Sequence, residues 1–283
     1  MRNPMAAGLI FLFACNGGGT DPASPDAPGG VDAPPSGGWT PLVTKTWTLE
    51  PGGEKTSDLQ IVDLDRDIYV GGMRPLAPVG THHTLLFRGV TGTNMIYASG
   101  VGTGELVFPP GKGLKLTAGE VLGLQLHIYN TSENSISGTS GIEIMEVDPS
   151  TVTDEVDLFL PGPQDLSLPA NQSTTLSGSC TVSTPYKVFA LFPHMHQYGT
   201  HFKTTLTIGG QTQTLHDAEY DFEHQDVKTF EPIQLNVGDK IDTECTWTNP
   251  TGGVVEEGES SDKEMCYSIL YRFPRGTEEF CND

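Results

Sequence analysis

The chain has 283 residues and a formal net charge of −21, from 36 acidic and 15 basic side chains. Such a surface repels nucleic-acid phosphates and anionic lipid headgroups, so neither is an expected partner, and it attracts cations. Glycine (34 residues) and proline (21) are abundant and no long amphipathic helical pattern occurs, so the composition predicts an all-β protein with many turns. The length fits two domains.

The first residues predict a targeting segment that is separate from the fold. Arg2 precedes an apolar stretch, 6–14, that is too short to remain as a membrane-spanning helix. The sequence LFAC at 12–15 resembles a bacterial lipobox, which predicts a signal peptide at 1–15 and lipidation of Cys15. An ordinary secretory signal is the alternative. The chain is therefore expected to be exported, as a periplasmic, outer-membrane or cell-surface lipoprotein that touches a membrane only through this anchor.

Residues 16–38 are almost entirely Gly, Pro, Asp, Ala and Ser. They cannot bury enough apolar surface to fold, so they predict a flexible tether. From Trp39 onward, short alternating apolar and polar stretches are separated by turn residues, which is typical of antiparallel strands in β-sandwiches. A change to polar, proline-containing sequence at 148–154 predicts a boundary between one domain at 39–150 and another at 151–283.

Three histidines of the first predicted domain are candidate metal ligands. His127 lies in the strand-like LQLHIY at 124–129, and His82 and His83 are adjacent. Neighbours on a regular strand point to opposite faces, so a metal ion shared by His82 and His83 requires a bulge or a strand end, which 78–81 could supply. Taken alone, His127 is more often a hydrogen-bonded structural residue than a ligand.

The second predicted domain contains an H-x-H motif, His194 and His196. Residues i and i+2 of a strand project to the same face, so both imidazoles can converge on one ion. Met265 lies in a polar loop before a predicted strand, and its thioether is a soft ligand that favours Cu(I) over zinc or calcium. Taken alone, Met265 is more often a packing residue. The remaining histidines are expected to be surface or supporting groups: His201, His216 and His224.

Apart from Cys15, the chain has four cysteines, all in the second predicted domain: Cys180, Cys245, Cys266 and Cys281. An even number in an exported protein predicts two disulfides.

These segments, in this order, resemble the copper type II, ascorbate-dependent monooxygenases, the family of dopamine β-monooxygenase and peptidylglycine α-hydroxylating monooxygenase. The segments that carry the resemblance are HHTLLF (82–87), LQLHIYN (124–130), PHMHQYG (193–199), CTWTN (245–249) and EMCY (264–267). The resemblance implies two antiparallel, jelly-roll-like β-sandwich domains that face each other across a cleft. It also implies the disulfide pairs Cys180–Cys281 and Cys245–Cys266.

The resemblance further implies two copper ions per chain. His82, His83 and His127 would hold the copper that supplies an electron, while His194, His196 and Met265 would hold the catalytic copper that activates O₂. The implied reaction hydroxylates a C–H bond, with O₂ and with ascorbate or another one-electron donor as co-substrates.

Three positions depart from the peptide-amidating branch of that family, where polar side chains hold the peptide carboxylate. Here these positions are Phe192, Tyr267 and Ile269. Peptide amidation is therefore not expected. The three residues are candidates for lining a substrate cleft, and Phe192 and Ile269 predict a small organic substrate that is apolar or aromatic. Two other hypotheses stay open: a non-catalytic copper-binding lipoprotein for storage, sensing or delivery, and a structural or adhesive β-sandwich whose histidines are incidental.

Overall fold

The structure, a computed structural model, describes residues 38–91, 94–258, 260 and 262–283. The predicted signal peptide with Cys15, and the predicted tether up to residue 37, lie outside the described residues. Within those ranges, no helix has both the length and the apolar character needed to cross a membrane.

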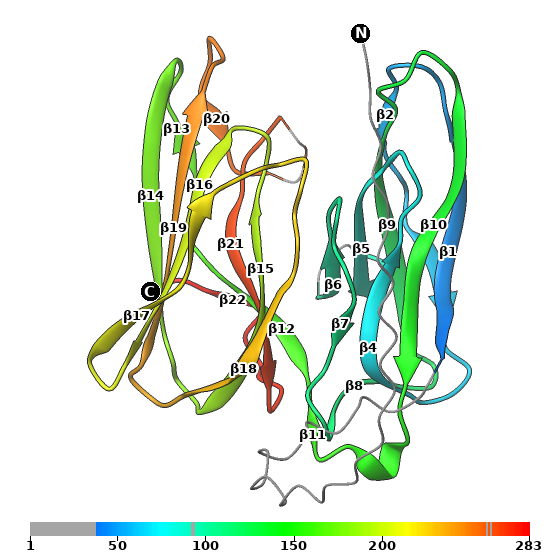
Figure 1. Ribbon diagram of the computed structural model, residues 1–283, viewed down its shortest axis with the longest axis vertical. Coiled ribbons are helices and arrows are strands. Elements are labelled where there is room, and N and C mark those ends of the chain that lie inside the picture. Colours follow the sequence, from blue (N-terminus) through cyan, green and yellow to red (C-terminus); the bar gives the residue numbers. More distant parts are fainter. Residues whose placement is uncertain (1–37, 92–93, 259, 261) are drawn as a thin grey trace, which may run out of the picture. The chain divides into compact units, whose positions relative to one another are not determined.

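The described chain is all-β, as the composition predicts (Figure 1). We call residues 39–155 the N-terminal half; its strands are β1 (Trp39–Leu49), β2 (Glu54–Thr56), β3 (Gln60–Asp63), β4 (Ile68–Leu76), β5 (Thr81–Arg88), β6 (Met95–Ser99), β7 (Leu106–Val107), β8 (Lys112–Leu116), β9 (Val121–Tyr129), β10 (Ile136–Glu146) and β11 (Asp154–Glu155). A short 3-10 helix, η1 (Pro149–Thr151), precedes β11.

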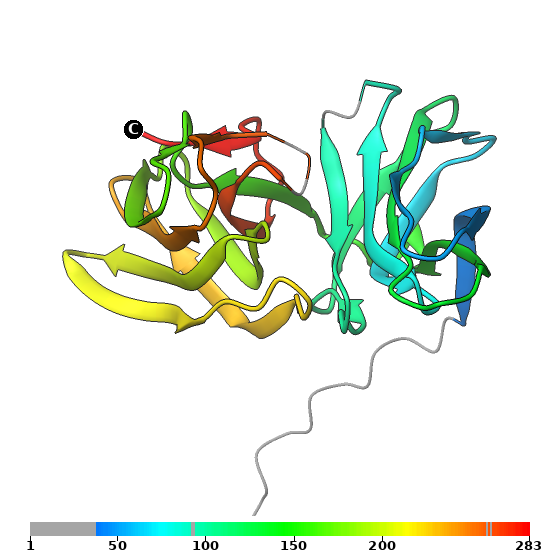
Figure 2. The ribbon, with the colours of Figure 1, turned by 90° about the horizontal axis from the view of Figure 1, so that it is seen from above.

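We call residues 157–283 the C-terminal half. Its strands are β12 (Asp157–Pro161), β13 (Ser167–Leu168), β14 (Gln172–Thr181), β15 (Tyr186–Met195), β16 (Gly199–Ile208), β17 (Gln211–Glu219), β18 (Lys228–Leu235), β19 (Lys240–Asn249), β20 (Val255–Glu256), β21 (Cys266–Phe273) and β22 (Phe280–Cys281). In Figures 1 and 2 the blue-to-green strands of the N-terminal half and the green-to-red strands of the C-terminal half form separate groups.

The N-terminal half contains two sheets. One has the order β1-β10-β4-β8-β11 with β7 beside β4, and the other has the order β2-β9-β5-β6 with β3 beside β9. In β9, alternate residues from Leu122 to Ile128 are buried in the core, whereas Gln125 and His127 between them are half-buried on the opposite face. This period of two places His127 on the face of the sheet where β5 brings its own histidines.

The C-terminal half contains a sheet of order β18-β15-β21-β12-β22, a sheet of order β14-β19-β16-β17, and the small pair β13-β20. β15 runs antiparallel to β21, so that Phe192 lies opposite Ile269 and His194 lies opposite Tyr267. The chain forms the disulfides Cys180–Cys281 and Cys245–Cys266, which are the pairs that the family resemblance implies.

One apolar core is shared by the two halves. It contains leucines of the N-terminal sheets, such as Leu124, and aromatic side chains of β15 and β21, such as Phe189 and Tyr271. The Phe108 ring of the N-terminal half lies edge-on to Phe189, with the ring centroids 5.7 Å apart. Two smaller cores lie within the C-terminal half. The halves are therefore joined by buried apolar contacts, since burial of such surface is the main favourable term in folding.

Candidate metal centre

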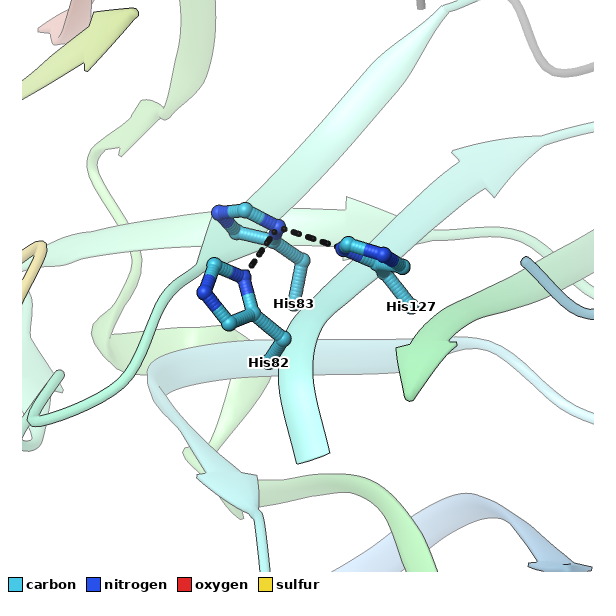
Figure 3. Close-up of side chains that lie close together, drawn as sticks. All are labelled: His82, His83 and His127. Atoms are coloured by element: carbon cyan, nitrogen blue, oxygen red, sulfur yellow. Dashed lines mark hydrogen bonds between the residues drawn. The ribbon is translucent and has the colours of Figure 1, made fainter. Parts of the chain in front are cut away.

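The side chains of His82, His83 and His127 converge on one point. His83 on β5 lies opposite His127 on β9, and the pairing shifts register between Thr81 and His83. This irregularity turns His82 to the same side as its neighbour, as ligation by adjacent histidines requires. The Nδ1 atom of His83 lies 3.1 Å from Nδ1 of His82 and 3.4 Å from Nδ1 of His127 (Figure 3).

These three imidazoles fit a metal ion. A metal–imidazole bond of about 2.0–2.1 Å places neighbouring ligand nitrogens roughly 3.3–3.6 Å apart, close to the separations found here. His82 and His83 are buried, and burial lowers the pKa of His82 to about 4 and the pKa of His83 well below its usual 6.5. The rings of His82 and His83 are therefore neutral at pH 7, the form that binds metals. Imidazole suits copper, zinc, iron and nickel.

The ring of His127 is oriented by a carboxylate. Its Nε2 atom lies 2.7 Å from Oε1 of Glu54 on β2. With Nδ1 turned toward the other two histidines, Nε2 carries the hydrogen and donates it to Glu54. A carboxylate behind a ligand histidine fixes the tautomer and raises the basicity of the ring, a common arrangement at metal sites.

The second pair of histidines, His194 and His196, lies at the end of β15 and just after it. The ring centroids are 5.2 Å apart. Nδ1 of His194 lies 3.1 Å from Oε1 of Gln225, and Nδ1 of His196 lies 3.1 Å from the backbone oxygen of Lys263. Both oxygens accept a hydrogen from Nδ1, so Nε2 of each ring keeps the lone pair that a metal ion needs. Burial lowers the pKa of His194 to about 4 and that of His196 to about 3.

Glu264 joins this histidine pair to the loop that carries Met265. Its fully buried carboxylate accepts hydrogen bonds from the backbone N–H groups of His196 (2.9 Å), Tyr198 (2.7 Å) and Met265 (3.3 Å), and from the indole N–H of Trp247 (2.8 Å). Burial raises the pKa of Glu264 to about 7, although all four donors favour its charged form. Sequence reasoning missed this residue, because its burial depends on strands far away in the chain.

A cavity of about 630 Å³ brings both histidine sets together. His83 and His127 line it together with His194, His196 and Met265. The three residues predicted to line a substrate cleft also lie on its wall: Phe192, Tyr267 and Ile269. Further apolar lining comes from Leu85, Phe87, Met95, Ala98, Leu160 and Phe280.

The loop 221–226 between β17 and β18 reaches the histidines of both sets. The Phe222 ring lies 4.5 Å from His82 and 6.4 Å from His196, measured between ring centroids. Gln225 contacts both His83 and His194. No local pattern in the sequence pointed to this loop. The histidines expected to be surface or supporting groups make contacts of that kind: His201 with Asp217 at 3.0 Å and His224 with Asp221 at 2.9 Å.

The described part of the chain is all-β, and four of the candidate histidines line one cavity together with Met265, while His82 lies beside His83 in the first cluster; these are the ligand types of a transition-metal protein. Residues 158–283 match the family model for the copper type II ascorbate-dependent monooxygenase C-terminal domain. The C-terminal half is thus a domain of the copper type II ascorbate-dependent monooxygenase family. Copper is the metal of this family, whereas imidazole ligands alone do not distinguish copper from zinc, iron or nickel.

A comparison with curated proteins finds no match. Among solved structures, A223, a turret protein in Sulfolobus turreted icosahedral virus, has 14% identity and a TM-score of 0.20, covering 81% of this chain and 96% of that one. Infectious bursal virus derived T=1 particles give 12% identity and a TM-score of 0.22, covering 85% of this chain and 71% of that one. TM-scores this low carry no structural or functional argument.

Proposed function

We propose that this protein hydroxylates a C–H bond of a small organic substrate, using O₂ and a one-electron donor such as ascorbate. The observation that carries the proposal is the shared cavity, which His83 and His127 of the first set, His194 and His196 of the second, Met265 and the apolar wall line together. A metal-storage or delivery protein needs the ligands but has no use for an apolar chamber of this size beside them.

We assign one copper ion to His82, His83 and His127 through their Nδ1 atoms, and a second to His194, His196 and Met265. Copper in these positions would supply one-electron chemistry and the activation of O₂. The residues of the chain do the rest: Glu54 and the carbonyl of Lys263 hold imidazole rings in the ligating tautomer. The apolar wall excludes water from the reacting C–H bond.

The cavity lining indicates what kind of substrate fits. Phe192 and Ile269 lie on paired strands and present an apolar surface next to His194. The charged groups on the wall are mostly carboxylates: Glu54, Glu257, Asp262 and Glu279, against Lys55. The hydroxyl of Tyr267 donates to Glu257 at 2.5 Å, so it is already engaged. We therefore propose an apolar or aromatic substrate that is neutral or cationic, and we expect substrates with a carboxylate to be rejected.

We further propose that the two halves act as two sandwich domains with this cavity as the cleft between them. For the location, the lipobox-like LFAC at 12–15 supports export and anchoring through a lipid on Cys15.

The test is copper analysis together with O₂ uptake. The untagged protein is loaded with copper, desalted and analysed for metal; we expect two ions per chain. O₂ consumption is then followed with ascorbate and a panel of neutral aromatics, aromatic amines and aromatic acids. Substitutions His194→Ala and Met265→Ala should abolish substrate-dependent uptake and leave one copper bound, whereas His201→Ala, outside the cavity, should change neither. Two bound coppers without substrate-dependent O₂ uptake across the panel would instead indicate a non-catalytic copper protein.

A further inference from the structure

The side-chain amide of Gln225 lies between the two histidine sets. Gln225 is 2% exposed. Its Nε2 atom lies 2.9 Å from Nε2 of His83, and its Oε1 atom lies 3.1 Å from Nδ1 of His194. One amide thus touches one ligand of each proposed copper site.

The backbone around Gln225 is held to the N-terminal half. Its N–H donates to the oxygen of Val101 at 3.0 Å, and its own oxygen accepts from the hydroxyl of Thr103 at 2.6 Å. Gly100 leaves room for the side chain, since a Cβ atom there would lie 2.6 Å from Cβ of Gln225. The Nε2 group also donates to the oxygen of Phe222 at 3.1 Å. The amide is therefore fixed in place between the two imidazoles.

The two ends of this amide have opposite hydrogen-bonding character. The oxygen accepts, so it fits His194 with a hydrogen on Nδ1, which leaves Nε2 of that ring ready to bind a metal ion. The NH₂ group donates, so it fits His83 with a lone pair on Nε2. In that tautomer the hydrogen of His83 lies on Nδ1, the atom that faces His82 and His127.

This arrangement conflicts with filling both sites. To bind an ion through Nδ1, His83 must carry its hydrogen on Nε2 instead. The Nε2–H of His83 then faces the NH₂ group of Gln225, so that two donors face each other without an acceptor. Turning the amide over satisfies His83, but it then sets the NH₂ group against the Nδ1 hydrogen of His194. A buried donor without an acceptor is costly, so each orientation of the amide suits only one of the two sites when filled, and neither orientation suits both at once.

We propose that Gln225 couples the two metal sites negatively: while its amide bridges His83 and His194, an ion at one site weakens binding at the other on the order of tenfold. This inference builds on the copper sites of the proposed function but not on the hydroxylation reaction. Complete loading requires Gln225 to release one of the two rings.

The test measures Cu(I) binding without oxygen, by competition with a chromophoric chelator. We call the site of His82, His83 and His127 the first site and that of His194, His196 and Met265 the second site. The Cu(I) affinity of the second site is measured in wild-type protein whose first site is filled, and in the His127→Ala variant. This variant weakens binding at the first site but leaves His83 and Gln225 in place. We expect the second site to bind Cu(I) about ten times more tightly in His127→Ala than in the wild-type protein with its first site filled; this factor is the ratio used below. In Gln225→Met, which cannot hydrogen-bond this way, and in Gln225→Glu, whose carboxylate accepts from both rings, the ratio should fall to about one.

Gly100→Ala supplies a variant that leaves Gln225 and every histidine unchanged. Its added Cβ displaces Gln225, so it should reduce the ratio as Gln225→Met does, whereas Gly104→Ala, which has open space around it, should keep the ratio at the wild-type value. A ratio that stays the same whatever residue stands at 225 overturns the proposal. Absence of Cu(I) binding would overturn the proposed function as well, but binding with no turnover would leave the coupling standing.

A second measurement reads the tautomers directly. Long-range ¹H–¹⁵N spectra of the metal-free protein with ¹⁵N-labelled histidine should show His83 and His194 both protonated on Nδ1. Finding the hydrogen of His83 on Nε2 in the metal-free wild-type protein contradicts the argument, because the donor conflict with Gln225 would then not arise on metal binding.

Discussion

His82 and His83 are neighbours in the sequence, and their Nδ1 atoms nevertheless face each other at 3.1 Å. In a regular strand the two rings would stand on opposite faces of the sheet. The pairing of β5 with β9 matches Thr81 to Ile128 and then His83 to His127, which leaves His82 without a partner in the ladder. The bulge therefore converts an alternating pair into two ligands that point the same way.

Glu54 provides a test of the first site that leaves its ligands intact. Glu54→Gln keeps the size of the side chain but removes the charge that faces Nε2 of His127. We expect copper affinity at the first site to fall by roughly tenfold or more, as is usual for supporting residues at metal sites. The second site should be unaffected, and Glu50→Gln is the matched control on the exposed turn before β2. Equal affinities for the Glu54→Gln and control proteins would show that the carboxylate does not support His127.

Glu264 should contribute strongly to stability. In the wild-type protein, four N–H groups donate to the carboxylate of Glu264. Glu264→Gln replaces one carboxylate oxygen with an NH₂ group, so some of these buried donors lose their acceptor. We expect the free energy of unfolding of the metal-free protein to fall by about 2–4 kcal/mol, measured by urea denaturation. Glu256→Gln breaks only an exposed 3.5 Å ion pair with Lys263 and should cost less than about 1 kcal/mol. Similar losses in the two variants would contradict the role assigned to Glu264.

The metal-free protein should lose stability as the pH falls below about 6.5. The pKa values of His82, His194 and His196 in the folded state are lowered to about 4, 4 and 3. The unfolded chain, with ordinary histidine pKa values, therefore binds more protons in this range, and the balance shifts toward unfolding. Each histidine should cost about 2 kcal/mol between pH 7.5 and pH 5.

Glu264 acts in the opposite direction over the same range. Its folded-state pKa is raised to about 7, so the folded protein binds the extra proton and gains stability as the pH falls from 8 toward 5. The net effect is a loss, because several histidines act against one carboxyl group. Urea midpoints at pH 7.5 and pH 5 check this, and His196→Gln should make the difference smaller. A wild-type midpoint independent of pH would be incompatible with buried, neutral histidines.

The two disulfides should have separable effects. Cys180–Cys281 closes a sequence separation of 101 residues and Cys245–Cys266 one of 21. By chain entropy, their removal costs about 5 and about 3 kcal/mol of unfolding free energy. Replacing Cys245 and Cys266 with alanine frees the backbone beside Met265, so the second-site Cu(I) affinity should fall too. Removal of Cys180–Cys281 should leave the second-site Cu(I) affinity unchanged. If that affinity falls when Cys180–Cys281 is removed but not when Cys245–Cys266 is removed, Met265 is not a ligand of the second site.

Some of this architecture follows from local rules in the sequence. The pattern LQLHIY predicts a strand that carries His127, and a metal ion shared by the adjacent His82 and His83 requires a bulge or a strand end; the structure has β9 at the first place and a register shift between Thr81 and His83 at the second. Both outcomes depend on neighbours within a few residues, where backbone geometry leaves few choices.

Other features could not be predicted in this way. Gln225 is a polar residue in a loop, and only the packing of that loop against 100–104 places it between His83 and His194. Glu264 sits in a stretch of charged residues and is nonetheless completely buried. Both placements come from contacts between segments distant in sequence, for which periodicity carries no signal.

In the proposed reaction, the core that the two halves share restricts how far an electron must travel between the two histidine sets. Swinging the halves apart would expose Phe108, Phe189 and Tyr271 to water, at a cost of roughly 1.5–3 kcal/mol for each large side chain. The distance between the two histidine sets is thus set when the chain folds and is not adjusted in each catalytic cycle. In that proposed reaction, substrate entry and product exit use the mouth of the cavity, so a bulky product would slow turnover at that opening without changing the rate of electron transfer.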